Sequence, residues 1–196
     1  RSPHPAHDPR VVPLVLDVTD EESVEQAALA APDVSIVVNN AGIGLGTPVL
    51  DAPLEDIRAE LDTNLFGLLR VSRAFAPALG RNRPSALVNV LSVLSWLSFG
   101  NGYEISKAAA WSATKALRLG LRDQGTTVTA VHVAFMDTDM TAGRDVPKSD
   151  PRDIARLTAD AISAGRLELL ADDTTRGAKA QLGADPSALY PADAAA

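Results

Sequence analysis

Cysteine is absent from this 196-residue chain, and so are membrane-length apolar runs and basic clusters. Without thiols the protein can form no disulfide bond and can use no thiolate nucleophile or ligand. No apolar run reaches the roughly 18 residues of a membrane-spanning helix. Only 18 Lys and Arg stand against 25 Asp and Glu, and this acidic balance disfavours binding to nucleic acid or to an anionic membrane. These absences predict a soluble globular protein, with the cytoplasm as its default location.

The length and the two chain ends define the expected domain organisation. Hydrophobic residues make up 46% of the chain and charged residues 22%, which is typical of one globular domain over residues 1–196. Residues 1–10 are polar and proline-rich, which predicts a loop and is unlike a signal peptide. Residues 184–196 are expected to be a poorly ordered tail. The chain begins with Arg1 rather than Met, which favours a longer natural protein.

Strand-like apolar runs alternate with helical patterns along the chain. The predicted strands cover residues 11–16, 34–38, 86–91, 127–133 and 167–170. The predicted helices cover residues 19–31, 53–79, 101–122 and 150–163, the first opened by a capping-box spacing at Thr19 and Glu22. This alternation is typical of an α/β fold with a mostly parallel sheet.

Polar residues follow four of the predicted strands where each strand ends. Asp17 follows the first strand, residues 39–42 follow the second, Ser92 follows the third and Thr138 follows the fourth. Ligands of open parallel sheets bind outside the carboxyl ends of the strands, so these residues predict a site there. For Asp17 the alternative is a structural cap of the following helix.

Tyr103 and Lys107 stand four residues apart in a predicted helix, so their side chains share one face. A cation beside a phenol favours the phenolate, and we expect Lys107 to lower the pKa of Tyr103 from about 10. Such a pair can transfer protons. The spacing alone is a weak signal, and a pair on a solvated helix surface is the alternative.

The order of several motifs resembles the short-chain dehydrogenase/reductase family. Asn39-Asn-Ala-Gly42 matches its Asn-Asn-Ala-Gly element, Asn64 its mid-helix asparagine, and residues 89–92 its serine-bearing strand, followed by Tyr103-x-x-x-Lys107. The resemblance covers most of the chain from Val11 onward. It implies a Rossmann-like doubly wound parallel sheet and an oxidoreductase that interconverts a carbonyl and an alcohol with NAD or NADP.

The resemblance also implies a role for each matched residue. Tyr103 would be the general acid or base, and Lys107 would lower its pKa and bind the nicotinamide ribose. Ser92 would hold the substrate oxygen, and Asn64 would support a water that relays protons to Lys107. The cofactor would contact Asp17, Val18, Asn39, Ala41, Gly42, Tyr103, Lys107 and Thr138. Arg1, at the place of a basic residue that binds a 2′-phosphate, slightly favours NADP.

One departure from the family is an absence. Its first strand, Gly-x-x-x-Gly-x-Gly loop, first helix and second strand have no counterpart here, so the domain is expected to be incomplete, with a gap between residues 11–16 and 34–38. Gly42-x-Gly44-x-Gly46 is no substitute, because the next helix starts too late to direct its N-terminus at a phosphate. Either the natural protein is longer, or the chain is a non-catalytic binding or regulatory module or an inactive fragment.

The surroundings of the expected site suggest a substrate, a lid and a partner. The apolar run 93–99 favours a partly apolar small-molecule substrate, and residues 140–149 could be a mobile lid. Ala134 stands where the family has glycine and adds a methyl near the expected nicotinamide.

Helices 64–79 and 101–122 carry apolar positions that build homodimers in relatives, although core packing gives the same pattern. We expect no metal site, although Asp137 and Asp139 are close in sequence, and we expect His132 to be a structural strand residue.

Overall fold

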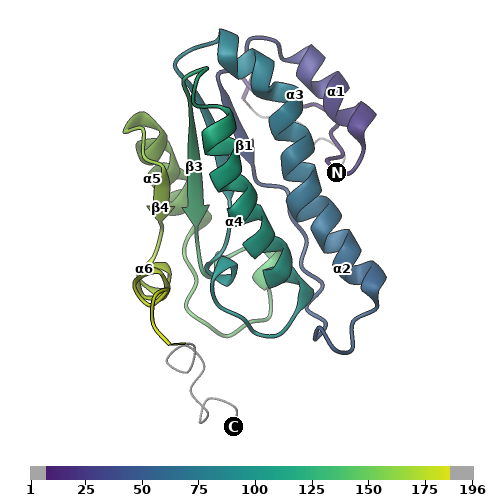
Figure 1. Cartoon of the computed structure of the whole chain (residues 1–196), viewed down its shortest axis with the longest axis vertical. Coiled ribbons are helices and arrows are strands. Elements are labelled where there is room, and N and C mark those ends of the chain that lie inside the picture. Colours follow the sequence, from purple (N-terminus) through teal and green to yellow (C-terminus); the bar gives the residue numbers. More distant parts are fainter. Residues whose placement is uncertain (1–7, 186–196) are drawn as a thin grey trace.

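Four parallel strands form the centre of the protein, which we describe from a computed structural model over residues 8–185 (Figure 1). The strands are β1 (Ile36–Asn39), β2 (Ser85–Val90), β3 (Thr126–His132) and β4 (Glu168–Leu170), in the order β1-β2-β3-β4. Asn39 pairs with Asn89, and Asn89 pairs with Ala130, so the carboxyl ends of β1 to β3 lie close together. The predicted parallel α/β sheet is confirmed.

Helices cover both faces of this sheet. They are α1 (Glu21–Ala30), α2 (Leu54–Leu61), α3 (Leu68–Arg81), α4 (Gly102–Gly120), α5 (Pro151–Ser163) and α6 (Asp173–Ala180), of which α6 was not predicted. Leu87 of β2 packs with α1 and α3, whereas its neighbour Val88 packs with Ile154 of α5. Successive strand side chains point to opposite faces, so the alternation along β2 directs α3 and α5 to opposite sides.

The long helical stretch 54–81 contains one irregular turn. Residues Asp62–Gly67 form a π-helix between α2 and α3, and Asn64 lies buried within it. A π-turn widens the helix locally and is frequent at functional sites. Leu68, Val71 and Phe75 of this stretch are buried in the protein's own core, whereas Leu54 and Phe66 are exposed. Core packing, the alternative that the sequence left open, therefore accounts for Leu68, Val71 and Phe75, and a homodimer stays a prediction.

The strand predicted at residues 11–16 is not formed. Val12 is 77% exposed and Val15 71% exposed, and the segment runs beside no strand in the described part of the chain. Ile36 and Val38 of β1 are about half exposed as well. An apolar run becomes a strand only when a neighbour pairs with its N–H and C=O groups, and none does so here.

Other local expectations have mixed outcomes. The N-cap of α1 is Asp20, whose carboxylate accepts a hydrogen bond from the Glu22 amide, so the predicted cap at Thr19 was wrong. Residues 8–10 form a bend and turn, as the predicted loop requires. Arg1 and most of the predicted tail, residues 186–196, lie outside the described residues. Within residues 8–185, no helix has the length and apolarity needed to cross a membrane.

Candidate active site

A large groove at the carboxyl ends of the strands brings distant parts of the chain together. It is lined by Asp17, Val18, Ala41, Gly42, Ser92, Tyr103, Lys107 and Thr138, among others. A second cavity lies beside it, and the two share Ser92 and Tyr103 in their walls. Most of the residues predicted from separate strand ends are therefore neighbours in space.

Tyr103 and Lys107 lie in the first two turns of α4. Asn101 and Glu104 form a capping box that starts this helix and fixes the position of Tyr103. The Lys107 ammonium lies 5.5 Å from the centroid of the Tyr103 ring and donates a hydrogen bond of 3.0 Å to the Val90 carbonyl. Burial of Lys107 lowers its pKa to about 8. The ammonium is therefore still mostly charged at neutral pH.

The pKa of Tyr103 is raised to about 12, so the expected lowering by Lys107 was wrong. Burial of the phenol is the largest cause, and the nearby Glu60 carboxylate also raises the pKa, whereas a hydrogen bond with the Ser92 side chain lowers it. Burial disfavours the phenolate more strongly than its polar neighbours favour it. Tyr103 is therefore a neutral hydrogen-bond donor at neutral pH in this structure.

Ser92 is held firmly at the end of β2. The Leu91 and Val93 amides on either side of it donate hydrogen bonds to Val131 and Val133, at 2.7 Å and 3.0 Å. The Ser92 hydroxyl accepts a hydrogen bond of 3.1 Å from the Leu94 amide. The Ser92 hydroxyl also hydrogen-bonds with the Tyr103 side chain, so its one proton lies beside the phenol oxygen at the groove wall.

Asn64 connects the loop after β1 to the start of α4. Its side-chain amide donates to the Ile43 carbonyl and to the Ser106 hydroxyl, both at 2.8 Å, and its Oδ1 accepts from the Ile43 amide at 2.9 Å. Ser106 in turn donates to the Tyr103 carbonyl at 2.6 Å. The buried Asn64 side chain therefore links the loop after β1 to the start of α4 by hydrogen bonds. Its place in the π-helix between α2 and α3 directs the side chain toward these partners.

Two glycine positions allow close packing beside these residues. A Cβ at Gly42 would lie 3.2 Å from the Asn64 Oδ1 and 3.7 Å from the Lys107 ammonium. A Cβ at Gly67 would lie 2.8 Å from a Val18 methyl, so Val18 packs directly on the helix. Gly42 lines the groove, whereas Gly67 lets Val18 take its place in the groove wall. The next helix after Gly46 begins at Leu54, as expected for a loop that is not a phosphate cradle.

Three other residues that the sequence predicted to contact the cofactor differ in how exposed they are to solvent. Asp17 is exposed, and its carboxylate accepts hydrogen bonds from the Thr19 amide and hydroxyl, which lower its pKa. Thr138 is exposed on the groove wall. The Asn39 side chain instead donates to Ser72 at 3.1 Å and to Asn89 at 2.9 Å inside the fold. Asn39 thus connects β1 to its neighbours.

Sequence reasoning missed two buried carboxylates. Glu104 accepts hydrogen bonds from the Phe99, Gly100 and Asn101 amides, at 2.7, 2.7 and 2.9 Å, and so shapes the loop beside the second cavity. The spacing Asn101-x-x-Glu104 was a visible capping-box signal. Glu60 is 2% exposed and accepts from the Leu45 amide at 2.7 Å. A single buried Glu in a helical pattern carries no comparable signal.

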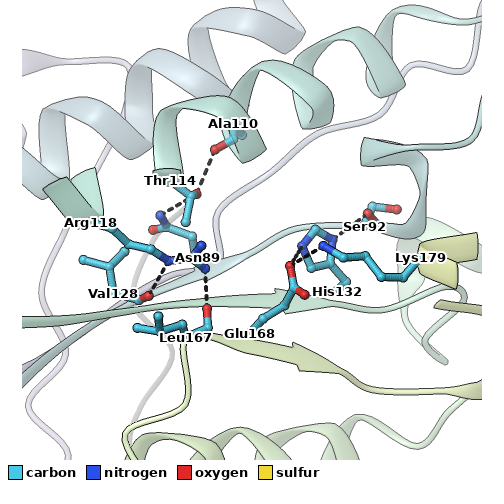
Figure 2. Close-up of polar contacts among 10 residues, drawn as sticks. All are labelled: Asn89, Ser92, Ala110, Thr114, Arg118, Val128, His132, Leu167, Glu168 and Lys179. Carbon is cyan, nitrogen blue, oxygen red and sulfur yellow. Dashed lines mark hydrogen bonds and ion pairs between the residues drawn. The ribbon is translucent and has the colours of Figure 1, made fainter. Parts of the chain in front are cut away.

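His132 lies next to Ser92 (Figure 2) and is not part of the lining of either cavity. Its Nδ1 lies 3.2 Å from the Ser92 carbonyl, and its Nε2 lies 3.7 Å from Glu168, which accepts a hydrogen bond of 3.0 Å from Lys179. The ring stacks on Trp96 with centroids 4.0 Å apart. Burial lowers the pKa of His132 to about 4, so the imidazole is neutral and structural, as expected for a strand histidine.

Comparison with known sequences places this architecture in one family. The profile of the family described as short chain dehydrogenase matches residues 3–148. Serine 3-dehydrogenase from Rhizobium radiobacter is 33% identical over 162 residues, which cover 76% of this chain and 65% of that protein. The chain spans about two thirds of the length of the curated relatives it matches.

Solved structures agree with the sequence match. A short chain dehydrogenase from Burkholderia cenocepacia, solved in complex with NADP, superposes with a TM-score of 0.87 and 36% identity, covering 93% of this chain and 78% of that one. A short chain dehydrogenase/reductase from Burkholderia phymatum, in complex with NAD, gives a TM-score of 0.73 and 26% identity over 85% and 72% of the two chains. This chain belongs to the short chain dehydrogenase family.

Proposed function

We propose that the protein is an NADP- or NAD-dependent oxidoreductase that interconverts a carbonyl and an alcohol on a small molecule. One observation carries this proposal: Ser92 and Tyr103 stand in the wall shared by a large groove and a smaller cavity. A cofactor in the groove and a substrate in the cavity would meet at these two side chains. The bound nicotinamide would supply or accept the hydride, and the protein would supply orientation and protons.

Tyr103 is suited to give a proton to the substrate oxygen. Its raised pKa keeps the phenol protonated at neutral pH, which favours the direction of carbonyl reduction. The Ser92 hydroxyl, whose oxygen already accepts from Leu94, can donate its proton to the same substrate oxygen. The Lys107 cation lies close enough to stabilise the phenolate that forms after proton transfer. In oxidation the same groups would work in reverse.

The groove suits a nicotinamide cofactor along most of its length. Asp17, Val18, Ala41, Gly42 and Thr138 all line the groove. A Cβ at Gly42 would lie only 3.2 Å from the Asn64 Oδ1, so a larger residue there would press on the groove wall. Of the two solved relatives above, the one with higher identity to this chain was solved with NADP. We therefore favour NADP over NAD.

Cofactor binding and turnover test this function. We would measure NADPH and NADH binding by calorimetry on this chain and on the chain extended by its upstream coding sequence, and then NADPH-dependent reduction of a ketone panel. Tyr103→Phe keeps the ring and should lower kcat/KM by about 10³-fold, the typical contribution of a general acid. Tyr190→Phe, at the other tyrosine of the sequence, is the matched control. Binding of neither cofactor to either protein would sink the proposal.

A further inference from the structure

Among residues 8–185, Arg144 is the one charged side chain in the lining of the cavity beside Ser92 and Tyr103. The same lining contains the two proposed catalytic hydroxyl groups. The rest of the wall is mostly apolar and includes Val93, Leu94, Phe99, Phe135 and Met140. A ligand that fills this cavity would therefore meet an apolar surface with hydroxyl donors at one place and a guanidinium at another.

Arg144 lies in a loop whose two ends are joined by backbone hydrogen bonds. The Ser149 amide donates a hydrogen bond of 2.8 Å to the Phe135 carbonyl, and the Asp137 amide donates one of 3.0 Å to the Ser149 carbonyl. Farther along the loop, the Arg144 amide donates to Thr141 at 3.2 Å. The guanidinium carbon lies 5.9 Å from the centroid of the Phe135 ring, a cation–π contact that keeps it over the cavity wall.

The charge of Arg144 is not neutralised within the described part of the chain. Arg156 and Arg176 pair with aspartates at 2.9 Å and 2.6 Å, but Arg144 forms no ion pair with any residue between 8 and 185. None of the residues between 8 and 185 that line the cavity is Asp or Glu. Arg144 is exposed, and a planar guanidinium can bind a carboxylate through two parallel hydrogen bonds.

We propose that the substrate is an oxo or hydroxy compound that carries a carboxylate, and that Arg144 binds this carboxylate. The apolar wall would hold the carbon chain between the two polar groups, while Ser92 and Tyr103 would meet the reacting oxygen. The assignment of the reacting end rests on the proposed function. The anion site at Arg144 rests only on the cavity and its charge.

Binding of two fatty-acid derivatives tests the anion site without any turnover. Octanoate and octanamide have the same carbon chain and nearly the same shape, and they differ in charge. Calorimetry on the full chain should find that octanoate binds about tenfold more tightly, the usual gain from a hydrogen-bonded charge pair. Arg144→Gln should remove this preference, and Arg144→Lys should keep part of it because the charge remains without the planar fork.

Arg122→Gln is the matched control, because Arg122 is also exposed and forms no ion pair among residues 8–185, yet lies outside the cavity lining. This variant should keep the full preference for octanoate. Equal binding of the two ligands, binding of neither, or a preference that survives Arg144→Gln would overturn the proposal. Tighter, Arg144-dependent binding of octyl phosphate would overturn the carboxylate in favour of a phosphate group.

The two proposals fail in different ways. One outcome is that octanoate binds through Arg144 while neither the chain nor its extended form reduces any carbonyl compound. That result would support the anion site and refute the oxidoreductase function. If ketones are reduced with NADPH but Arg144→Gln leaves octanoate binding unchanged, the function stands and the carboxylate site falls.

Discussion

Lys107 and His132 are two buried bases that lie against carbonyl groups at the end of the same strand. The Lys107 ammonium donates a hydrogen bond to the Val90 carbonyl. The His132 Nδ1 lies 3.2 Å from the carbonyl of Ser92, two residues further along the chain. Burial lowers the pKa of both groups, to about 8 and about 4. Yet Lys107 lines the groove, whereas His132 is fully buried and stacked on Trp96.

The difference teaches that a perturbed pKa near a catalytic candidate does not by itself assign a role. Lys107 stays mostly charged at neutral pH and lies beside a phenol that faces two cavities. His132 is neutral at the same pH and has no access to either cavity. Lys107 and His132 therefore differ in whether a ligand can reach them. The packing of α4 against β2 and β3 decides this difference.

Among variants of this strand end and its surroundings, removing Lys107 should give the largest change. Lys107→Met is expected to lower kcat/KM by about 10²–10³-fold, since the charge that favours proton transfer from Tyr103 is lost. The same variant should raise the free energy of unfolding by about 1 kcal/mol at pH 7, because a buried charge is removed with its desolvation cost. Steady-state kinetics and urea denaturation measure the two effects.

Lys107 also makes stability depend on pH. Its folded pKa of about 8 lies below its ordinary value of 10.5, so the unfolded state binds more protons between these two values and stability rises with pH across that window. Lys107→Met should abolish the rise. Lys115→Met, at an exposed lysine of the same helix, should keep it together with wild-type activity. A Lys107→Met protein with full activity would contradict the role of this lysine.

Ser92 and Ser95 offer a matched pair three residues apart, both buried. Ser92→Ala should lower kcat/KM by about 10²-fold, because one donor to the substrate oxygen is lost. Ser95→Ala should leave activity unchanged, since the Ser95 hydroxyl has no hydrogen-bond partner among the described residues and lines neither cavity. Equal losses in the two variants would indicate that packing, and not a hydroxyl contact, accounts for the effect.

His132 should matter for stability in acid and little for activity. Its folded pKa of about 4 lies below its ordinary 6.5, so the unfolded state binds more protons between these values and stability falls as the pH is lowered through this range. The contribution between pH 7 and pH 5 is about 2 kcal/mol. In His132→Gln the unfolding free energy should lack this part of the pH dependence. An unchanged pH dependence would show that other groups cause it.

Lys179 should give the smallest change. Its ammonium bonds to Glu168 at 3.0 Å and lies 4.9 Å from the Trp96 ring centroid, but a third of its side chain is exposed. Lys179→Met is expected to cost about 0.5–1 kcal/mol of stability, with less effect at high salt. Thermal denaturation at two ionic strengths checks this. A loss above about 2 kcal/mol would mean that α6 anchors the strand end more strongly than its exposure indicates.

The sequence predicted most elements that have strong periodic patterns and clear ends. The helix predicted from residue 101 has Asn101 as its N-cap, and the start of α5 followed from Asp150 followed by Pro151. Residues 11–16 had an equally strong apolar pattern and still formed no strand. Strand formation depends on a partner distant in the chain, which local pattern cannot report.

The residues of the candidate site also differ in how far the local sequence could predict their positions and contacts. Tyr103 and Lys107 could be placed on one helix face from their spacing, and Ser92 and Thr138 at one edge of the sheet from the strand order. The sequence could not show that Asn39 bonds inward to Asn89, nor that Glu60 lies close enough to raise the pKa of Tyr103. The first contact joins β1 to β2, and the second arises where α2 packs against α4.

By itself, then, the sequence determined most of the alternating elements and the family, and it proposed Ser92, Tyr103 and Lys107 as site residues, because these follow from local periodicity and from motifs at known spacing. The tertiary structure alone decided the direction of the Tyr103 pKa, the separation of Lys107 from His132 and the placement of Arg144 in the lining of the cavity beside Ser92. Burial and electrostatic surroundings are sums over residues far apart in the chain, so they exist only once the chain has folded.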